Sequence, residues 1–458
     1  MVKTIPVLLL GLYCSLAGAQ EVQEYVLNNG LKLLVKEDHR APVVVSQVWY
    51  KVGSSYEHDG ITGVSHALEH MMFKGTRKYG EGEFSRIIAE NGGNENAFTA
   101  DDYTGYYQMM EKSRLPISFE LEADRMRNLT LPAEAFEKEI EVVKEERRLR
   151  TEDNPNAAMR EVAAATAFQT SPYRQPIIGW MADLDSMKVE QLRDWYKLWY
   201  APNNATVIVV GDVSAQEVYK LARKYFGPLK KESITPPVPR PEVSQSGIKR
   251  VVVKRVAEIP RIMMAYKVPG LKSSLEQGSE VEAWEPYALE VLAGILSGGS
   301  SARFESRLVR GQEIADGLGS SYQMAGRLDG LFTIGGTPAQ GRTVAELESA
   351  IRQQIEELQQ AEVTEQELQR VKAQVVSSDV YERDSVYYQA MILGIFETVG
   401  LGWQLADEYV GRIQEITAAQ VQAVARKYFI DDRVTVAVLE PLPMERDEAG
   451  RGPSGPGE

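Results

Sequence analysis

The second half of the chain repeats the first, and this repeat constrains the fold more than any other feature. Residues 66–70, His-Ala-Leu-Glu-His, match residues 287–291, Tyr-Ala-Leu-Glu-Val, at an offset of 221. Near the end of each half, the apolar runs at 205–210 and 433–438 follow aromatic residues, at an offset near 230. A chain of 458 residues is too long for one ordinary core. The repeat therefore predicts two domains of the same fold.

A proline-rich segment separates the two copies. Residues 231–247 contain four prolines and have a composition typical of an extended interdomain linker. We therefore predict a first domain at residues 20–230 and a second at residues 248–441. Residues 442–458 are rich in glycine, proline and charge, which predicts a disordered tail.

Strand and helix patterns are mixed within each copy. Alternating apolar residues at 25–35 surround an Asn-Gly pair suited to the tight turn of a β-hairpin. A strand at 43–52 leads directly into a helix, and residues 249–256 and 261–268 restart the paired strands in the second copy. We predict the α+β class, with a mainly antiparallel sheet flanked by helices in each domain.

The first residues have the pattern of a secretory signal peptide. Lys3 precedes an apolar run from Ile5 to Leu16, and Ala-Gly-Ala follows. The run is too short to cross a bilayer, so we predict a signal peptide at residues 1–19; an uncleaved anchor is the alternative. No other run is long and apolar enough to span a membrane. We expect an exported protein, periplasmic or secreted, with no stable membrane span after cleavage.

Cysteine content and charge constrain the partners and the bonding of the mature chain. The only cysteine, Cys14, lies within the predicted signal peptide, so the mature chain has no disulfide. The formal net charge of −14 disfavours nucleic acid as a partner.

Two of the four histidines, His66 and His70, are spaced to bind one metal ion. Positions four apart on a helix share a face, so both imidazoles can reach the same ion. Glu69 lies on a neighbouring part of the helix surface, where a general base can touch a metal-bound water. The order His-x-x-Glu-His is the inverzincin signature. A plain polar stripe is the alternative, but the apolar neighbours indicate a buried helix, where these groups need a partner such as zinc.

A carboxylate from elsewhere has to complete such a site, because the motif supplies only two ligands. Residues 132–150 favour a helix on which Glu139 and Glu146, seven apart, lie on the same face. We predict Glu146 as the third ligand, and Glu139 is the second choice. For both residues the alternative is an ordinary ion pair with the lysines and arginines of the same segment.

A polar, strand-like segment lies between these two helices, at residues 94–107. Its simplest role is that of an ordinary sheet strand. The functional alternative is an exposed edge, against which an extended peptide lies as an added strand held by backbone hydrogen bonds.

These features together resemble the pitrilysin family of zinc peptidases, most closely its bacterial two-domain members and the β subunit of the mitochondrial processing peptidase. The resemblance rests on the motif at 66–70, on Glu139 and Glu146, on residues 96–99 and on a second copy without the motif. The 75 residues between His70 and Glu146 are similar to the family spacing.

The resemblance implies two similar halves that face each other across a cavity, with one zinc ion per chain. It makes His66, His70 and Glu146 the zinc ligands, Glu69 the general base and Glu139 a residue that orients a ligand. It also implies that four residues of the polar strand pair with the substrate backbone. These are Asn96, Ala97, Phe98 and Thr99.

The function that this resemblance implies is zinc-dependent endopeptidase activity on extended or unfolded peptides. One alternative is a catalytically weak or silent zinc-binding subunit, which acts as a scaffold or partner in a heteromeric peptidase. Another is an exported metal-binding or chaperone module, which would keep the metal ligands without needing Glu69.

One departure from the family pattern concerns the second half. Active single-chain relatives carry there an arginine and a tyrosine seven apart, and here the expected pair falls on Val309 and Asp316. A one-residue shift offers Arg310 but places Gly317 where the tyrosine belongs. We therefore expect a dimer. One form of it is a heterodimer with a related subunit that supplies the Arg/Tyr pair. The alternative is a homodimer or monomer that uses other residues, Tyr322 or Arg327.

Overall fold

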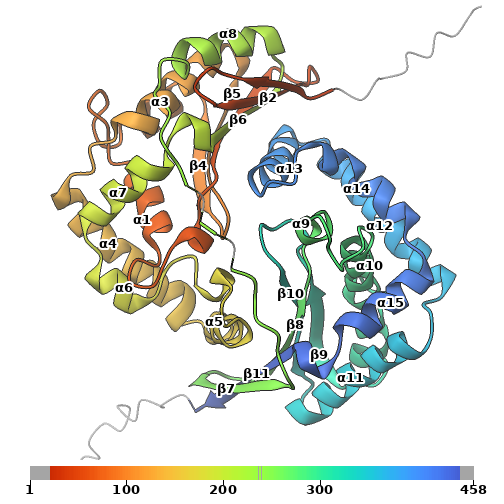
Figure 1. Ribbon diagram of the computed structural model, residues 1–458. Coiled ribbons are helices and arrows are strands. Elements are labelled where there is room, and N and C mark those ends of the chain that lie inside the picture. The colour runs from red at the N-terminus through yellow and green to blue at the C-terminus, as the bar shows by residue number, and fades with distance from the viewer. Residues whose placement is uncertain (1–20, 236, 239, 444–458) are drawn as a thin grey trace, which may run out of the picture.

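The computed structural model describes residues 21–235, 237–238 and 240–443 (Figure 1). The predicted signal peptide and residues 444–458 of the predicted tail lie outside this part of the chain. Within it, two sheets with their own helices form two halves that face each other (Figure 1). The predicted α+β class is therefore confirmed.

The first sheet has six strands in the order β1-β2-β6-β3-β5-β4. The predicted hairpin is β1 with β2, and β4 forms the far edge. All neighbouring pairs are antiparallel except β2 with β6. The strands are β1 (Gln23–Val26), β2 (Lys32–Glu37), β3 (Val43–Tyr50), β4 (Asn94–Thr99), β5 (Thr104–Glu111) and β6 (Ala205–Gly211).

The second sheet repeats this topology without an equivalent of β1. Its order is β7-β11-β8-β10-β9, and only β7 with β11 is a parallel pair. We expected residues 249–256 and 261–268 to pair with each other, but the last strand, β11, inserts between them. The strands are β7 (Lys249–Val256), β8 (Arg261–Val268), β9 (Ala315–Ser321), β10 (Gly330–Pro338) and β11 (Val434–Leu442).

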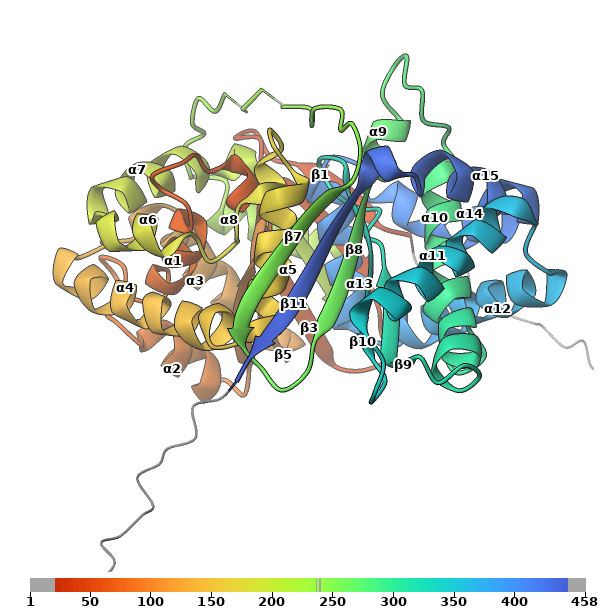
Figure 2. The same cartoon turned by 90° about the horizontal axis from the view of Figure 1, so that it is seen from below.

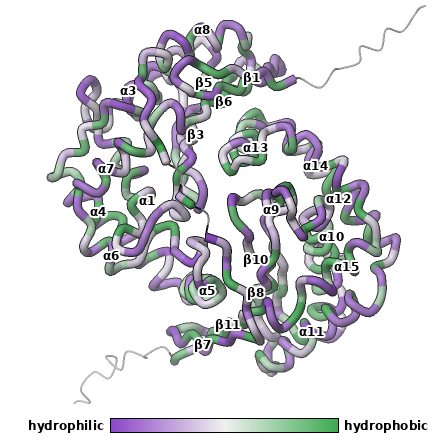
Figure 3. The backbone as a smooth tube through the Cα atoms, in the orientation of Figure 1, coloured by the Kyte–Doolittle hydropathy of each residue, from purple (hydrophilic) through white to green (hydrophobic). Residues whose placement is uncertain are grey.

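Helices cover both sheets, and the repeated helices α1 and α10 each follow the equivalent strand, β3 or β8. Figure 3 shows α10 as largely apolar, in agreement with its place inside the second core. In the first half the helices are α1 (Val64–Met71), α2 (Glu83–Glu90), α3 (Leu115–Asn128), α4 (Ala133–Arg147), α5 (Pro155–Ala167), α6 (Met181–Ser186), α7 (Val189–Trp199) and α8 (Ala215–Tyr225). In the second half they are α9 (Leu271–Ser274), α10 (Glu285–Ser297), α11 (Val344–Gln360), α12 (Glu365–Glu382), α13 (Val386–Thr398), α14 (Gln404–Glu415) and α15 (Ala418–Tyr428).

Each half places one helix on the sheet of the other half. Helix α5 packs on β7, β8 and β11, where Met159 and Ala163 join the apolar side chains of the second sheet (Figure 2). Helix α13 packs on β3 and β6, where Ala390 and Leu393 contact a cluster that includes the fully buried Trp49. The two halves are therefore interlocked by a reciprocal exchange of helices.

The described residues of the predicted linker form no helix or strand, but the end of the linker is fixed in place. Glu242 accepts hydrogen bonds from the backbone N–H groups of residues 169–171 and pairs with Lys267 at 2.6 Å. Burial alone would raise the pKa of Glu242, but Lys267 and the three N–H groups lower the pKa to about 2. In the part of the chain that the structure describes, no helix has the length and apolar character needed to cross a membrane.

Candidate metal centre

Helix α1 is preceded by a glycine, Gly63, because the start of the helix lies against another segment of backbone. Gly63 has a φ of 86°, and a Cβ there would lie 2.4 Å from the carbonyl oxygen of Ile178. The buried Glu57 carboxylate accepts hydrogen bonds from the backbone N–H groups of Gly63 at 2.7 Å and Ser65 at 2.8 Å. The indole N–H of Trp195 donates to Ser65 Oγ at 3.1 Å. These contacts fix the position of α1 and of the two histidines it carries.

The structure brings the three predicted ligands together. The Nε2 atoms of His66 and His70 lie 3.7 Å and 3.3 Å from Glu146 Oε2, and the three ligand atoms all lie within 4.8 Å of one another. Ligand atoms about 2.1 Å from a tetrahedral zinc ion are separated by roughly 3.4 Å. Two imidazoles from α1 and one carboxylate from α4 thus have the chemistry and the spacing of a His₂Glu zinc site.

The protonation of His66 suits a metal ligand. Burial, followed by the nearby His70 and Arg150, lowers the pKa of His66 to about 3, so its imidazole is neutral at pH 7. Neutral imidazole is the form that binds metal. The buried Nδ1 atom of His66 has no hydrogen-bond partner among the described residues.

Glu139 lies behind the ligand set and outside it. One carboxylate oxygen is 2.9 Å from His70 Nδ1, and the other is 2.7 Å from Lys74 Nζ. Burial alone would raise the pKa of Glu139, but the bonds to Lys74 and His70 lower it. An ionised Glu139 accepting from Nδ1 holds the opposite nitrogen, Nε2, toward Glu146.

Glu69 and the polar strand line the same cavity as the three ligands. This cavity has a volume of about 1070 Å³. Glu69 accepts a hydrogen bond from Thr99 Oγ1, and burial raises the pKa of its carboxyl group. Asn96, Ala97 and Phe98 also line the cavity, and their strand, β4, pairs on one side only, with β5. Among the described residues, the other edge of β4 carries no paired strand, and Thr99 at the end of β4 lies beside Glu69.

Comparisons with known proteins place this geometry in a family. Residues 32–180 match the family model described as Insulinase (Peptidase family M16), and residues 186–375 match the model described as Peptidase M16 inactive domain. The zinc protease PqqE of Helicobacter pylori is 31% identical over 445 residues, which cover 94% of this chain and 97% of that protein. The chain belongs to peptidase family M16.

Further relatives of this M16 chain differ in what their names state. YmxG of Bacillus subtilis, named an uncharacterized zinc protease, is 26% identical and covers 92% of this chain and 98% of its own. The crystal structure of a protease from Helicobacter pylori has a TM-score of 0.86 at 29% identity, covering 92% of this chain and 100% of that one. A peptidase M16 inactive domain from Pseudomonas fluorescens shares the fold, with a TM-score of 0.81 at 18% identity and 93% and 100% coverage. Membership therefore gives a zinc-protease-like class that includes inactive-domain proteins.

The second half of this M16 chain retains only part of the motif. Helix α10 occupies the place of α1, with Tyr287 and Val291 at the two histidine positions. Glu290 stands at the position of Glu69. Among the described residues, only His66, His70 and Glu146 come close enough to share a metal ion.

The positions expected to carry an Arg/Tyr pair lie away from the metal cavity. Val309 ends the helical turn 304–309, Asp316 and Gly317 lie in β9, and none of them lines the cavity. Arg310 donates to the carbonyl oxygen of Ser300. The structure therefore offers no such pair at the metal centre from these positions.

The two substitutes considered from the sequence are engaged elsewhere. Tyr322 donates its hydroxyl to the carbonyl oxygen of Pro269 at 2.6 Å. Arg327 reaches into the first half, where it donates to Ser55 O at 3.0 Å and its backbone N–H donates to Asp102 at 2.8 Å. Neither residue lines the metal cavity.

Two residues that bear on the site had no assigned role in the sequence. The first is Arg150, which the sequence analysis attributed to ordinary ion pairs. It lines the cavity, and its Nη1 atom lies 2.7 Å from Glu146 Oε1. Its spacing of four from Glu146 is the signal that could have found it. Glu57 accepts hydrogen bonds from the backbone at the start of α1, six residues later in the chain. No local sequence pattern predicts a glutamate in this role.

Proposed function

We propose that this M16 chain is a zinc-dependent endopeptidase that hydrolyses extended or unfolded peptides. The observation that carries the proposal is one cavity in which His66, His70 and Glu146 converge beside Glu69 and a free strand edge. The family relatives named zinc proteases support the same class.

The proposed chemistry divides into separate tasks for the residues of the chain. When bound, a zinc ion supplies Lewis acidity, which polarises a carbonyl group and acidifies water. Glu69 takes a proton from the attacking water and delivers it to the leaving amine. Glu139 keeps His70 oriented through Nδ1. The edge of β4 aligns the peptide by backbone hydrogen bonds, so the cleavage site is selected more by an extended conformation than by side-chain identity.

The discriminating experiment separates metal binding from catalysis. Purified full chain, with zinc and with a chelator, is incubated with a mixture of unstructured peptides, and the products are identified by mass spectrometry. Glu69→Gln should retain one zinc per chain and lose nearly all hydrolysis, because the ligands remain while the base is removed. Glu146→Ala should lose zinc and hydrolysis together.

The matched control is Glu137→Ala, which removes an exposed carboxylate from the same helix, α4, and should change neither zinc content nor turnover. Wild-type turnover by Glu69→Gln would show that Glu69 is not the base. A wild-type chain that binds zinc but hydrolyses no peptide, with zinc content and peptide binding unchanged in Glu69→Gln, would instead favour a metal-binding or chaperone module, which does not need Glu69.

A second candidate function, that of a weak subunit in a two-chain peptidase, is favoured by the composition of the metal cavity. Among the described residues that line it there is no tyrosine, and Arg150 is the only basic residue besides the two histidines. Losing donors to the developing oxyanion typically costs about 10²- to 10³-fold in turnover. We propose that a related subunit supplies an arginine and a tyrosine, which makes the active form a heterodimer.

Reconstitution tests this second candidate. The chain alone should bind zinc and cleave peptides slowly, and a related subunit that carries the Arg/Tyr pair should raise turnover by about 10²-fold or more. Full activity from a demonstrably pure single chain would refute the need for a partner. A fall of that activity in Arg150→Ala would then assign the role to Arg150.

A further inference from the structure

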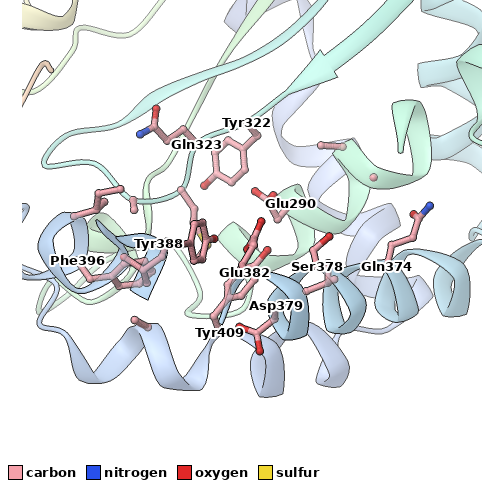
Figure 4. A pocket seen from close by; sticks show the side chains of 18 of the residues that line it. Glu290, Tyr322, Gln323, Gln374, Ser378, Asp379, Glu382, Tyr388, Phe396 and Tyr409 are labelled. Atoms are coloured by element: carbon pink, nitrogen blue, oxygen red, sulfur yellow. The ribbon is translucent and has the colours of Figure 1, made fainter. Parts of the chain in front are cut away.

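The second half contains a cavity at the place that corresponds to the metal cavity of the first half. Its volume is about 650 Å³, and it lies between α10, the end of β9 and helices α12, α13 and α14 (Figure 4). The metal cavity lies in the same way beside α1, β4, α4 and α5. The cavity therefore occupies the duplicated position of the active site, without the two histidines.

Glu290, the counterpart of Glu69, projects into this cavity between Tyr322 and Glu382 (Figure 4). Glu69 has Thr99 as a hydrogen-bond donor, whereas no described residue donates a hydrogen bond to Glu290 or pairs with it. Burial raises the pKa of Glu290 to about 7. Glu290 is partly buried, and its desolvated carboxyl group has no partner among the described residues, so a ligand that supplies a donor or a positive charge is favoured.

Aromatic rings form the walls around this carboxylate. Tyr388 and Phe396 come from α13, Tyr409 comes from α14, and Tyr322 follows β9 (Figure 4). The faces of such rings carry negative potential and attract cations, most strongly where water is excluded. The aromatic rings and the Glu290 carboxylate therefore both favour a positively charged ligand.

The charged residues of the lining agree with this sign. Four carboxylates and two basic groups line the cavity. The basic group of Arg383 is already paired with Asp379 at 2.7 Å, and burial lowers the pKa of the other, Lys36. The lining residues with charge are Glu290, Asp379, Glu382, Asp407, Lys36 and Arg383.

A metal ion is a poorer occupant than an organic cation. No three acidic or histidine side chains of this cavity lie close enough to share an ion, within the part of the chain that the structure describes. The volume suits a small molecule with an apolar body, because pockets for such ligands span roughly 300–1,000 Å³. Val371, Val375 and Ile392 supply apolar surface for that body.

We propose that this cavity binds a small organic cation, with Glu290 as the counter-ion and Tyr388 and Tyr409 as aromatic walls. The cationic group is an ammonium or guanidinium. It belongs either to a free amine or to a basic side chain of a peptide. Peptide hydrolysis at the metal centre is not needed for this binding.

Calorimetry with the zinc-loaded full chain tests the proposal. The probes are 2-phenylethylammonium, its neutral analogue 2-phenylethanol and the anion 3-phenylpropanoate, and a blocked Gly-Lys-Gly peptide distinguishes a peptide source from a free amine. At least one cationic probe should bind about tenfold or more tightly than the neutral analogue, because a charge-assisted bond replaces an unpartnered carboxylate. The same measurement on His66→Ala, with its metal centre removed, should give the same affinity.

Variants locate the binding. Glu290→Gln should remove the preference for the cation, whereas Glu408→Gln, which lies one residue from Tyr409 and does not line the cavity, should keep it. Tyr409→Leu should weaken cation binding several-fold and Tyr409→Phe should not, because only the first removes the ring. The Tyr409 pair serves as the test if Glu290→Gln does not fold.

Equal affinity for the cation and the alcohol would overturn the proposal. So would a preference that survives both Glu290→Gln and Tyr409→Leu, or the absence of binding by either cationic probe at millimolar concentration.

Discussion

A methyl group added at Gly394 should destabilise the contact between the two halves. Gly394 lies in α13, and a Cβ there would stand 2.1 Å from Cε2 and 2.3 Å from Cζ2 of Trp49. Ordinary Cβ contacts begin at 3.4 Å, so α13 has to move by 3.4 − 2.1 = 1.3 Å, or the indole has to turn. The indole cannot turn freely, because Trp49 is fully buried and its N–H donates to Gln47 at 2.8 Å.

The expected change in unfolding free energy for Gly394→Ala follows from two opposing effects. Alanine in a helix interior is favoured over glycine by about 1 kcal/mol, whereas overpacking a rigid core typically costs 1–3 kcal/mol. A displacement of this size along a whole helix lies at the upper end of that range, so we expect Gly394→Ala to lose about 2 kcal/mol of unfolding free energy in total.

The matched control is Gly411→Ala in α14, where a Cβ would meet nothing within 4 Å. That variant should gain up to about 1 kcal/mol from helix propensity alone. Urea unfolding of both variants, followed by far-UV circular dichroism, compares them directly. If Gly394→Ala proves as stable as Gly411→Ala, α13 is not seated on Trp49 as described.

Three further predictions concern the metal centre, the linker and the N-terminus. Glu139→Gln should keep zinc bound but weaken its affinity about 10- to 100-fold in a chelator competition, and unchanged affinity would remove Glu139 from the support of His70. The pKa of Glu242 is about 2 in the folded chain and near 4.5 in the unfolded chain, so Glu242 stabilises the fold above pH 4.5, and this stabilisation is lost as the pH falls toward 2. Acid titration of the wild type should therefore show a loss of unfolding free energy of roughly 1–2 kcal/mol, after allowance for solvent screening. Glu242→Gln should not show this loss. Protein recovered outside the cytoplasm should begin at Gln20, and N-terminal sequencing that finds Met1 on exported protein would contradict cleavage after Ala19.

Local patterns in the sequence were sufficient for the two histidines. His66 and His70 follow from helical spacing alone, and the structure places both on α1 as that spacing requires. Glu146 needed one more step, the demand for a third ligand, and the structure brings it within 3.7 Å of His66. The hairpin and the edge strand likewise follow from alternation and turn residues.

The features that sequence reasoning missed all depend on residues far apart in the chain. The insertion of β11 between β7 and β8 joins strands separated by more than 160 residues, which no local period encodes. The support of α1 by Glu57 and Trp195 depends on tertiary approach in the same way. The exchange of α5 and α13 was also invisible, because an amphipathic pattern shows that a helix has an apolar face but not which sheet covers it.

That exchange limits how far the two halves can separate. A clamshell opening about the linker would have to pull α13 away from Trp49 and α5 away from the second sheet at the same time. Either step exposes buried apolar surface that costs several kcal/mol per helix. A single cut in the linker should therefore leave the two pieces associated and the zinc ligands in place. For the proposed peptidase, we therefore expect substrates to reach the β4 edge as unfolded chains, without a wide separation of the two halves.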